Sequence, residues 1–416
     1  MNSNNIRFDL SPFLIHFFRK VDLEKGELIT PEDWGPGEIV EDTTLSPIFL
    51  LRNALRIQRL WATWSERTNR RTCESERTVY GPYPAVCFTD MPIAAFLEAG
   101  EARAKKKQAM SPIGLVLPRA AMLKAGARPA IYGLSTSPKV PKAEEGEPRL
   151  IPSTAMPLKE QYRYVTLRSD GRVDWMHERE WRWPYKNAPM ELEEGLRPNN
   201  GKDIPGLDLG FDGMGVIVRT EKQVKRILHD VLVLADQKRP GRYDFILVRD
   251  KISSLKKLRS PAAVQEALSA ASIDLEPYLK MAKSERKALS EAFNKCVHDV
   301  PRDKMPSGGK EDGGCWLWLT DVTHQMTRAL KLEGRVTINC QGNYLVDVGA
   351  FSPNLSLAKR EELTRRLSKL LLSRHGVAST YYSVLGKFDP DELPFYSAPP
   401  FESRFIFNYG DNEEDY

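Results

Sequence analysis

Two glutamates separated by a single residue are the clearest chemical signal in the sequence. Glu178 and Glu180 lie in the segment 174–183 (DWMHEREWRW). In an extended strand the side chains alternate between two faces, so the two carboxylates would share one face about 6.6 Å apart. Carboxylates this close repel each other, which raises the pKa of one of them unless a cation such as Arg182 compensates. A pair of this kind can stabilise developing positive charge or move a proton.

The same alternation places Trp175, Trp181 and Trp183 on the opposite face of the predicted strand, where we expect them to pack against a core. A solvated edge strand would show the same pattern. The glutamate pair is therefore a candidate site, with an ordinary edge strand as the alternative, and the three indoles favour a firmly anchored strand.

Other familiar catalytic and metal-binding patterns are missing from the sequence. It has no G-x-x-x-x-G-K-[ST], no dinucleotide fingerprint after a strand, no G-x-S-x-G and no H-E-x-x-H. The five cysteines form no C-x-x-C pair, and the Cys and His residues beyond 290 lack metal-ligand spacing. We therefore expect no metal site and no disulfide framework.

The sequence predicts a cytoplasmic protein, which the sparse, unpaired cysteines also favour. No apolar run approaches the length needed to span a bilayer, and the first 20 residues lack the features of a signal peptide. Hydrophobic residues make up 41% of the chain and charged residues 28%, which is enough to bury a core. The net charge of +5 neither identifies nor excludes a nucleic-acid partner.

Short strands and helices must position the glutamate pair. Apolar runs bounded by turn residues predict strands over 13–18, 85–89, 113–117, 129–134, 162–167, 175–183, 215–219 and 245–248. Helices are predicted over 47–60, 90–108 and 118–125 and from 220, the first with Ser46 as N-cap and Pro47 as first helical residue. The basic run at 103–107 (RAKKK) is typical of a solvated helix face and less often of a phosphate contact.

The last third of the chain has its own order of elements. The pattern predicts helices over 284–298, 321–332 and 357–374, strands over 315–319 and 379–385, and a hairpin of strands 335–340 and 344–348. From the first of these strands onward the order is β-α-β-β-α-β, as in the ferredoxin-like fold. The tail, with Asp411, Glu413, Glu414 and Asp415, is acidic.

The sequence therefore predicts an α+β protein with two principal domains. The first covers residues 1–260, a helical connector covers 261–282, and a smaller C-terminal α/β domain covers 283–416.

Five segments of the first domain match a known pattern. They are 14–18 (LIHFF), 86–92 (VCFTDMP), 113–116 (IGLV), 126–132 (GARPAIY) and 177–182 (HEREWR). Together they resemble the ADP-ribosyltransferase fold, and more specifically abortive-infection proteins of the AbiGi type from bacterial phage defence. The resemblance covers residues 10–250, approximately, and implies a split β-sheet domain that uses NAD as a substrate.

The resemblance implies a role for each carboxylate. Glu180 would bond the nicotinamide ribose and stabilise positive charge as nicotinamide leaves, and Glu178 would orient or deprotonate the acceptor. Arg182 would belong to the same NAD-binding site.

Four more residues are implied to bind NAD. His16 would hold the adenosine-side ribose from the first strand, Tyr132 would stack on nicotinamide, and Phe88 and Thr89 would line the pocket. The alternatives are a satisfied buried histidine and ordinary core positions. His16 stands where the arginine-modifying class of this fold has an arginine, so the pattern is closer to the histidine class, which includes nucleic-acid modifiers of the DarT type.

The resulting hypothesis is an ADP-ribosyltransferase toxin of antiphage defence that transfers ADP-ribose from NAD to a nucleic acid or a protein. The expected partners are this acceptor and a cognate antitoxin or regulator, and the C-terminal domain would recognise one of them. Two alternatives stay open: NAD hydrolysis with water as the acceptor, and a catalytically inactive ADP-ribosyltransferase-like protein that serves as an antitoxin or binding partner.

Overall fold

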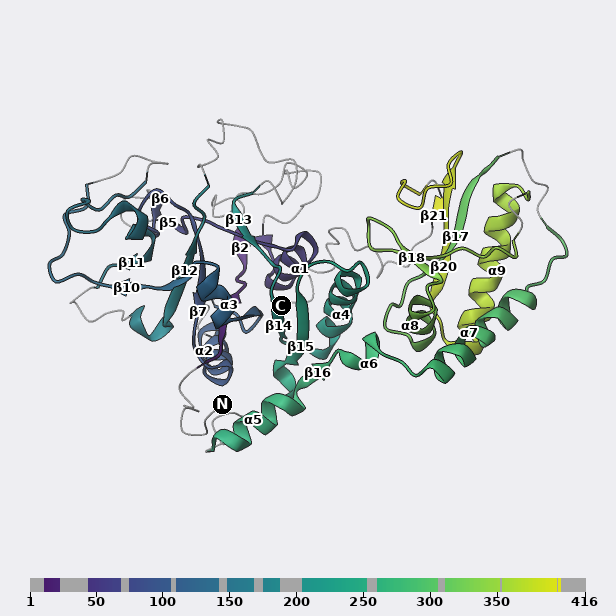
Figure 1. Cartoon of the computed structure of the whole chain (residues 1–416), viewed down its shortest axis with the longest axis horizontal. Helices are drawn as coiled ribbons and strands as arrows, with labels where there is room; N and C mark the ends of the chain where they lie inside the picture. Colours follow the sequence, from purple (N-terminus) through teal and green to yellow (C-terminus); the bar gives the residue numbers. More distant parts are fainter. Residues whose placement is uncertain are drawn as a thin grey trace. The chain divides into compact units, whose positions relative to one another are not determined.

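The computed structural model describes eleven stretches of the chain, which form two compact units (Figure 1). Among the described residues, the first unit consists of those up to 224 and of those from 240 to 273, and the second of 225–239 and of those from 274 to 397. The described stretches are 11–22, 44–68, 75–105, 110–141, 148–167, 175–187, 204–252, 260–305, 311–351, 354–394 and 396–397. Both units combine helices with a β-sheet, so the predicted α+β class is confirmed.

An eight-stranded mixed sheet forms the centre of the first unit, in the order β16-β15-β14-β8-β1-β7-β12-β9 (Figure 1). Among the strand pairs of this sheet with a described register, only the pair of β14 and β15 is parallel. The strands are β1 (Phe13–Phe17), β7 (Ala85–Thr89), β8 (Gly114–Pro118), β9 (Arg128–Pro129), β12 (Glu180–Pro184), β14 (Asp212–Val218), β15 (Arg242–Val248) and β16 (Ser272–Asp274).

Helices α2 (Ile93–Lys105) and α5 (Pro261–Ala270) cover one face of this sheet. Phe96 and Leu97 of α2 are fully buried against Ile15, Val116 and Ile217, which come from three neighbouring strands. We call this the α2 face. Burial of its apolar side chains is the main favourable contribution to the packing of α2 on the sheet.

Smaller elements complete the first unit. They are β2 (Val21–Asp22), β3 (Thr44–Leu45), α1 (Pro47–Ile57), β4 (Arg59–Trp61), β5 (Glu66–Thr68), β6 (Ser75–Arg77), α3 (Arg119–Lys124), β10 (Ile131–Tyr132), η4 (Leu158–Arg163), β11 (Tyr164–Val165), η5 (Trp175–Glu178), β13 (Gly206–Asp208) and η6 (Arg249–Lys251). Ser46 caps α1 as predicted, its Oγ accepting from the Phe49 N–H at 3.2 Å. The strand predicted over 162–167 is present only as β11, because 162 and 163 close the 3₁₀ helix η4 and 166 and 167 lie beyond the strand.

The second unit has a five-stranded antiparallel sheet in the order β18-β19-β17-β20-β21. Its strands are β17 (Gly313–Leu319), β18 (Val336–Ile338), β19 (Tyr344–Val346), β20 (Ser379–Leu385) and β21 (Tyr396–Ser397), and its helices are α6 (Glu276–Leu279), α7 (Lys283–His298), α8 (Gln325–Leu332) and α9 (Leu357–His375). Helices α7, α8 and α9 pack on one face through Leu317 and Leu319, and the other face has an aromatic cluster around Trp318 and Tyr382 (Figure 1). The predicted β-α-β-β-α-β order is present from β17 to β20.

The chain passes between the units inside helix α4 (Glu221–Asp236), after Arg239 and after Ile273. The last of these passages lies within the predicted connector at 261–282, whereas the first two were not predicted. Helix α5 and strand β16 from that range belong to the first unit, and α6 belongs to the second. The acidic tail beyond 409 lies outside the described residues. No helix in the described stretches is long and apolar enough to cross a membrane.

A buried ion pair explains why the end of α4 belongs to the second unit. Arg328 of α8 donates to both carboxylate oxygens of Asp236, at 2.5 and 3.0 Å, and to the Tyr278 carbonyl at 2.6 Å. The Tyr344 hydroxyl donates to the same carboxylate at 2.5 Å. The side chains of Arg328 and Asp236 are only 2% and 8% exposed, so each charge depends on the other.

We expect Arg328→Met to lower the free energy of unfolding by about 3 to 5 kcal/mol, because it leaves the Asp236 carboxylate buried without its cation. Lys280→Met is the matched control, since Lys280 forms an exposed ion pair with Glu276 in the same unit. Urea denaturation of both variants measures the difference. Equal stability of the two variants would contradict a structural role for the buried pair.

Candidate functional site

The segment that contains the two glutamates is not a continuous strand. Residues Trp175–Glu178 form the 3₁₀ helix η5, Arg179 has a left-handed backbone with φ of 48°, and the strand begins at Glu180. The prediction of a strand over 175–183 is therefore wrong for its first half. Left-handed backbone is uncommon for a residue other than glycine, so neighbouring groups must hold it in place.

Thr89 and Asp90 hold this turn from the end of β7. The Thr89 hydroxyl donates to the Glu178 carbonyl at 2.6 Å, and the Asp90 N–H donates to the Arg179 carbonyl at 3.2 Å. The Asp90 carboxylate also accepts from the Arg179 Nε at 2.6 Å. Both residues lie about 90 positions away in sequence, which is why strand periodicity misses the turn.

The more deeply buried face of β12 carries Arg182 rather than the tryptophans. Arg182 is only 5% exposed, whereas Trp181 and Trp183 are half-buried. Arg182 Nε and Nη2 donate to the two oxygens of Glu180, at 2.8 and 3.2 Å. Its Nη1 donates to the carbonyls of Tyr162 and Tyr164, at 2.7 and 3.3 Å. A charge can be buried here because every donor group of Arg182 finds an oxygen.

Tyr132 is hydrogen-bonded to Glu180, and the charges of both glutamates affect its hydroxyl. Its hydroxyl accepts from the Glu180 N–H at 2.9 Å. Burial raises the pKa of Tyr132 to about 12, and the negative charges of Glu180 and Glu178 contribute to the rise. Burial also raises the pKa of the Cys87 thiol, with Glu180 as the next cause. Tyr132 and Cys87 are therefore protonated at neutral pH, next to two carboxylates.

Glu178 pairs with a residue of the predicted basic run. Arg103, near the end of α2, donates to the Glu178 carboxylate at 2.8 Å and also contacts the His177 ring. Arg103 is thus engaged within the candidate site, and the lysines at 106 and 107 lie outside the described residues.

His16 and Phe88 face the other side of the sheet. Thr89 pairs with Glu180 and Ile15, so by alternation Glu180 lies on the α2 face and the neighbouring Phe88 on the opposite face. The His16 ring contacts Phe18 and Phe88, at centroid distances of 5.0 and 5.8 Å. The register therefore separates His16 and Phe88 from the carboxylates.

His16 behaves as a satisfied internal histidine. Its Nδ1 lies 2.9 Å from the Cys87 carbonyl, so a neutral ring with hydrogen on Nδ1 donates to that oxygen. Burial lowers the pKa of His16 to about 4, which keeps the ring neutral.

The structure thus brings together Glu178, Glu180, Arg182 and Tyr132, and adds residues that sequence reasoning did not select: Cys87, Asp90 and Arg103. Cys87 and Asp90 lie inside the quoted segment 86–92, which was a usable signal. The pairing of Arg103 with Glu178 left no trace in the sequence pattern. Among the described residues, no group of three His, Cys, Asp or Glu side chains could hold a metal ion.

Comparisons with known proteins find one match. Residues 281–409 match the model of a family described as "Protein of unknown function (DUF4427)". This range nearly coincides with the continuous part of the second unit, whose described residues run from 274 to 397. No curated protein and no solved structure matches the chain.

Removal of Arg182 should be the most damaging single change in the cluster. We expect Arg182→Gln to lower the free energy of unfolding by about 3 to 5 kcal/mol, because Glu180 is left without its cation inside the unit. The double variant Glu180→Gln/Arg182→Gln should recover part of the loss, since it removes both charges. Arg242→Gln, which breaks an exposed pair with Asp244, serves as the control in the same urea titration.

His16 should make the protein less stable in acid. Its folded pKa of about 4 lies below the unfolded value of 6.5, so the unfolded chain binds more protons between these pH values. The free energy of unfolding has its full value above pH 6.5, and it falls by about 2 to 3 kcal/mol as the pH approaches 4. His16→Asn retains a donor for the Cys87 carbonyl but cannot titrate, so it should lose less stability over this window. If the unaltered chain and His16→Asn lost the same free energy of unfolding between pH 6.5 and pH 4, this prediction would be contradicted.

Proposed function

We propose that the first unit is an ADP-ribosyltransferase-like domain, with its active site at Glu178, Glu180 and Tyr132. One observation carries the proposal: the half-buried Tyr132 hydroxyl accepts from the Glu180 N–H at 2.9 Å, and the Glu178 and Glu180 carboxylates come from the same turn. Carboxylates that a turn presents beside a phenol suit a reaction in which positive charge develops on the substrate.

The residues present fit the ribose end of NAD. Loss of nicotinamide leaves an oxocarbenium-like sugar, which a nearby carboxylate stabilises. Glu180 is held in one orientation by Arg182, and a carboxylate that accepts two such bonds keeps lone pairs for ribose hydroxyls. Glu178 takes the role of orienting or deprotonating the acceptor, and the Tyr132 ring offers a flat apolar surface to nicotinamide.

The proposal assigns no NAD contact to His16 or Phe88, because both lie on the opposite face from Glu180. Thr89 acts indirectly, since its hydroxyl holds the Glu178 carbonyl and accepts from the Met91 N–H at 3.1 Å. In this arrangement His16 stabilises β7 from the face opposite Glu180, and the reaction takes place on the α2 face.

For the second unit we propose a ferredoxin-like topology that recognises the acceptor or a regulator. Support comes from the antiparallel order β18-β19-β17-β20, in which β19 lies between the strands that flank helix α8. This is the split β-α-β arrangement. The acceptor, a nucleic acid or a protein, and a cognate antitoxin are proposed on the resemblance alone, as are antiphage defence and a cytoplasmic location.

A catalytically inactive, partner-binding protein is the second candidate. One observation favours it: both glutamates already have arginine partners, Arg182 for Glu180 and Arg103 for Glu178. Charges that are compensated within the fold can be purely structural. NAD hydrolysis is a variant of the first candidate in which water replaces the acceptor.

Incubation of the purified chain with NAD labelled on the adenylate, in the presence of bacterial and phage extracts, tests the proposal. We expect a labelled macromolecule and released nicotinamide with the unaltered chain, and a loss of about 100-fold or more with Glu180→Gln. Glu160→Gln is the matched control, because Glu160 also pairs with an arginine, Arg163, but stands outside the cluster. Thermal melts check that each variant is folded.

The outcomes separate the candidates. Released nicotinamide without a labelled macromolecule selects NAD hydrolysis. Neither product, together with no NAD binding by calorimetry, selects the inactive protein. Equal labelling by Glu180→Gln and the unaltered chain would overturn the mechanism.

A further inference from the structure

An acidic strap with outward apolar side chains follows the last long strand of the second unit. We use this name for residues 387–393 (KFDPDEL). Phe388 is 58% exposed and Leu393 is 76% exposed, the largest fraction among the exposed large hydrophobic side chains of the described residues. Asp389, Asp391 and Glu392 lie between them, and Lys387 pairs with Glu392, so three acids stand against one cation within the strap. The Arg360 guanidinium lies over the Phe388 ring, 5.7 Å from its centroid. A single exposed apolar residue is normal on a protein surface. Two of them within seven positions, with three acids between them, form a surface that is both apolar and acidic.

The strap is held in place by polar contacts with the second unit. The Cys340 N–H donates to the Asp391 carboxylate at 2.6 Å, and the Tyr382 hydroxyl donates to the Glu392 carbonyl at 2.7 Å. The Asn339 amide donates to the Pro390 carbonyl at 3.1 Å. Phe388 and Leu393 are therefore presented from an ordered backbone, which reduces the entropy lost when they bind.

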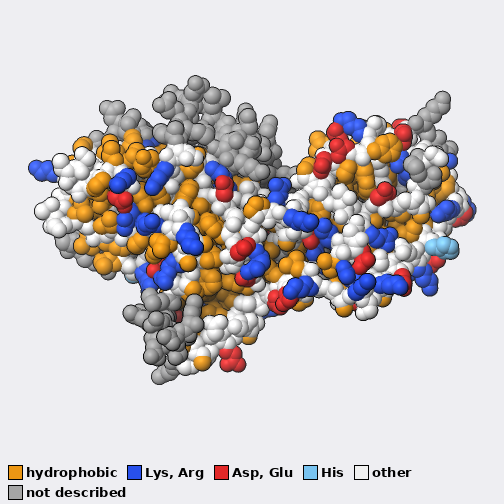
Figure 2. Space-filling model, in the orientation of Figure 1, with side chains coloured by type: hydrophobic (Ala, Val, Ile, Leu, Met, Phe, Trp, Pro, Cys, Tyr) orange, Lys and Arg blue, Asp and Glu red, His pale blue; other side chains and the backbone are white. Residues whose placement is uncertain are grey.

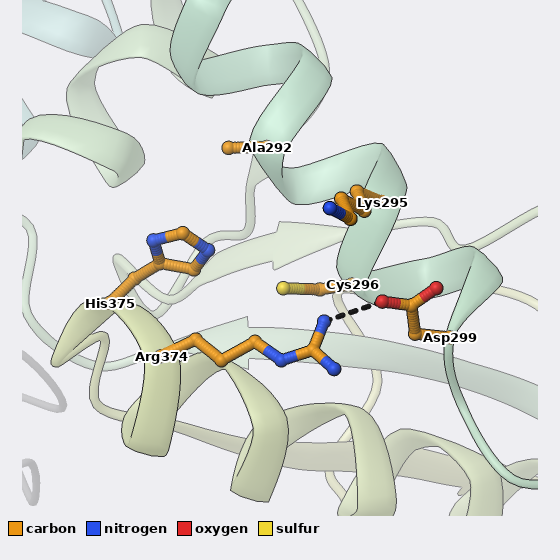
Figure 3. A pocket seen from close by; sticks show the side chains of 6 residues that line it. All are labelled: Ala292, Lys295, Cys296, Asp299, Arg374 and His375. Carbon is orange, nitrogen blue, oxygen red and sulfur yellow. Dashed lines mark hydrogen bonds and ion pairs between the residues drawn. The ribbon is translucent and has the colours of Figure 1, made fainter.

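A cavity of about 290 Å³ lies elsewhere on the same unit, between α7 and α9. Ala292 and Cys296 form its apolar part, and Lys295, Asp299, Arg374 and His375 complete its lining (Figure 3). Arg374 donates to Asp299 at 2.6 Å, so Lys295 supplies cationic charge that this pair does not cancel. An apolar cavity beside cations suits a leucine or phenylalanine that has acids next to it.

The strap of the same chain cannot fill this cavity. The cavity is lined by the last residues of α9, just before β20 begins, whereas the strap follows the other end of β20. Seven extended residues separate the two ends by about 20 Å, and the contacts with Asn339 and Cys340 hold the strap at its own end.

We propose that the acidic strap of one copy of this chain docks into the α7–α9 cavity of a second copy. Leu393 or Phe388 enters the cavity, and the strap acids face Lys295. Each copy has one strap and one cavity, so the contact closes as a pair that exchanges straps or continues as a chain of copies. The proposal is independent of any activity of the first unit.

Sedimentation of the full chain over a range of concentrations, at low and at high salt, tests the proposal. We expect association that weakens at high salt, because strap and cavity rim have opposite charges. Leu393→Ser should weaken association about tenfold, by loss of an apolar anchor. Ala292→Phe, which fills the cavity, and Lys295→Glu, which reverses its rim charge, should do the same from the other side. Leu158→Ser, an exposed leucine of the first unit, is the control.

Mixing two variants gives the sharpest result. Leu393→Ser has a defective strap and an intact cavity, and Ala292→Phe has the reverse. Together they should form one-to-one pairs, although each alone stays a monomer at the same concentration. A monomeric unaltered chain at low salt would overturn the proposal, and so would association that none of Leu393→Ser, Ala292→Phe and Lys295→Glu weakens.

Discussion

The buried ion pair between Glu180 and Arg182 is the interaction on which the first unit depends. A guanidinium that is 5% exposed needs an oxygen for every donor group, and it obtains them from Glu180 and from the Tyr162 and Tyr164 carbonyls. Three elements, β12, η4 and β11, are thereby joined at one side chain. Any reaction at Glu180 must therefore use a carboxylate whose position is already determined by the fold.

The second unit is organised by the same physical rule. Arg328 is 2% exposed and takes its oxygens from Asp236 and Tyr278. Because Asp236 lies at the end of α4, a segment far upstream in sequence becomes part of the unit. The family match begins only at 281, so the matched sequence is smaller than the structural unit that needs this ion pair.

Compensated carboxylates are compatible with both functions considered above. An ion pair that orients Glu180 serves catalysis if a ribose hydroxyl can still reach the oxygens, and serves only folding if none does. The position of His16 is likewise compatible with both functions. A neutral, internally bonded histidine on the face opposite Glu180 stabilises β7 in either case, so NAD chemistry would depend on the α2 face alone.

Local pattern in the sequence determined those elements that lie away from the glutamate turn and η4. Ala85–Thr89 and Ser379–Leu385 are strands as predicted, Ser46 caps its helix, and the order from β17 to β20 is correct, because apolar periodicity and capping act over a few residues. Tertiary structure decided the site. Thr89 and Asp90 impose a left-handed backbone at Arg179, and strand register places His16 away from Glu180. Contacts between residues about 90 positions apart leave no period in the sequence, so only the folded chain determines which charges meet.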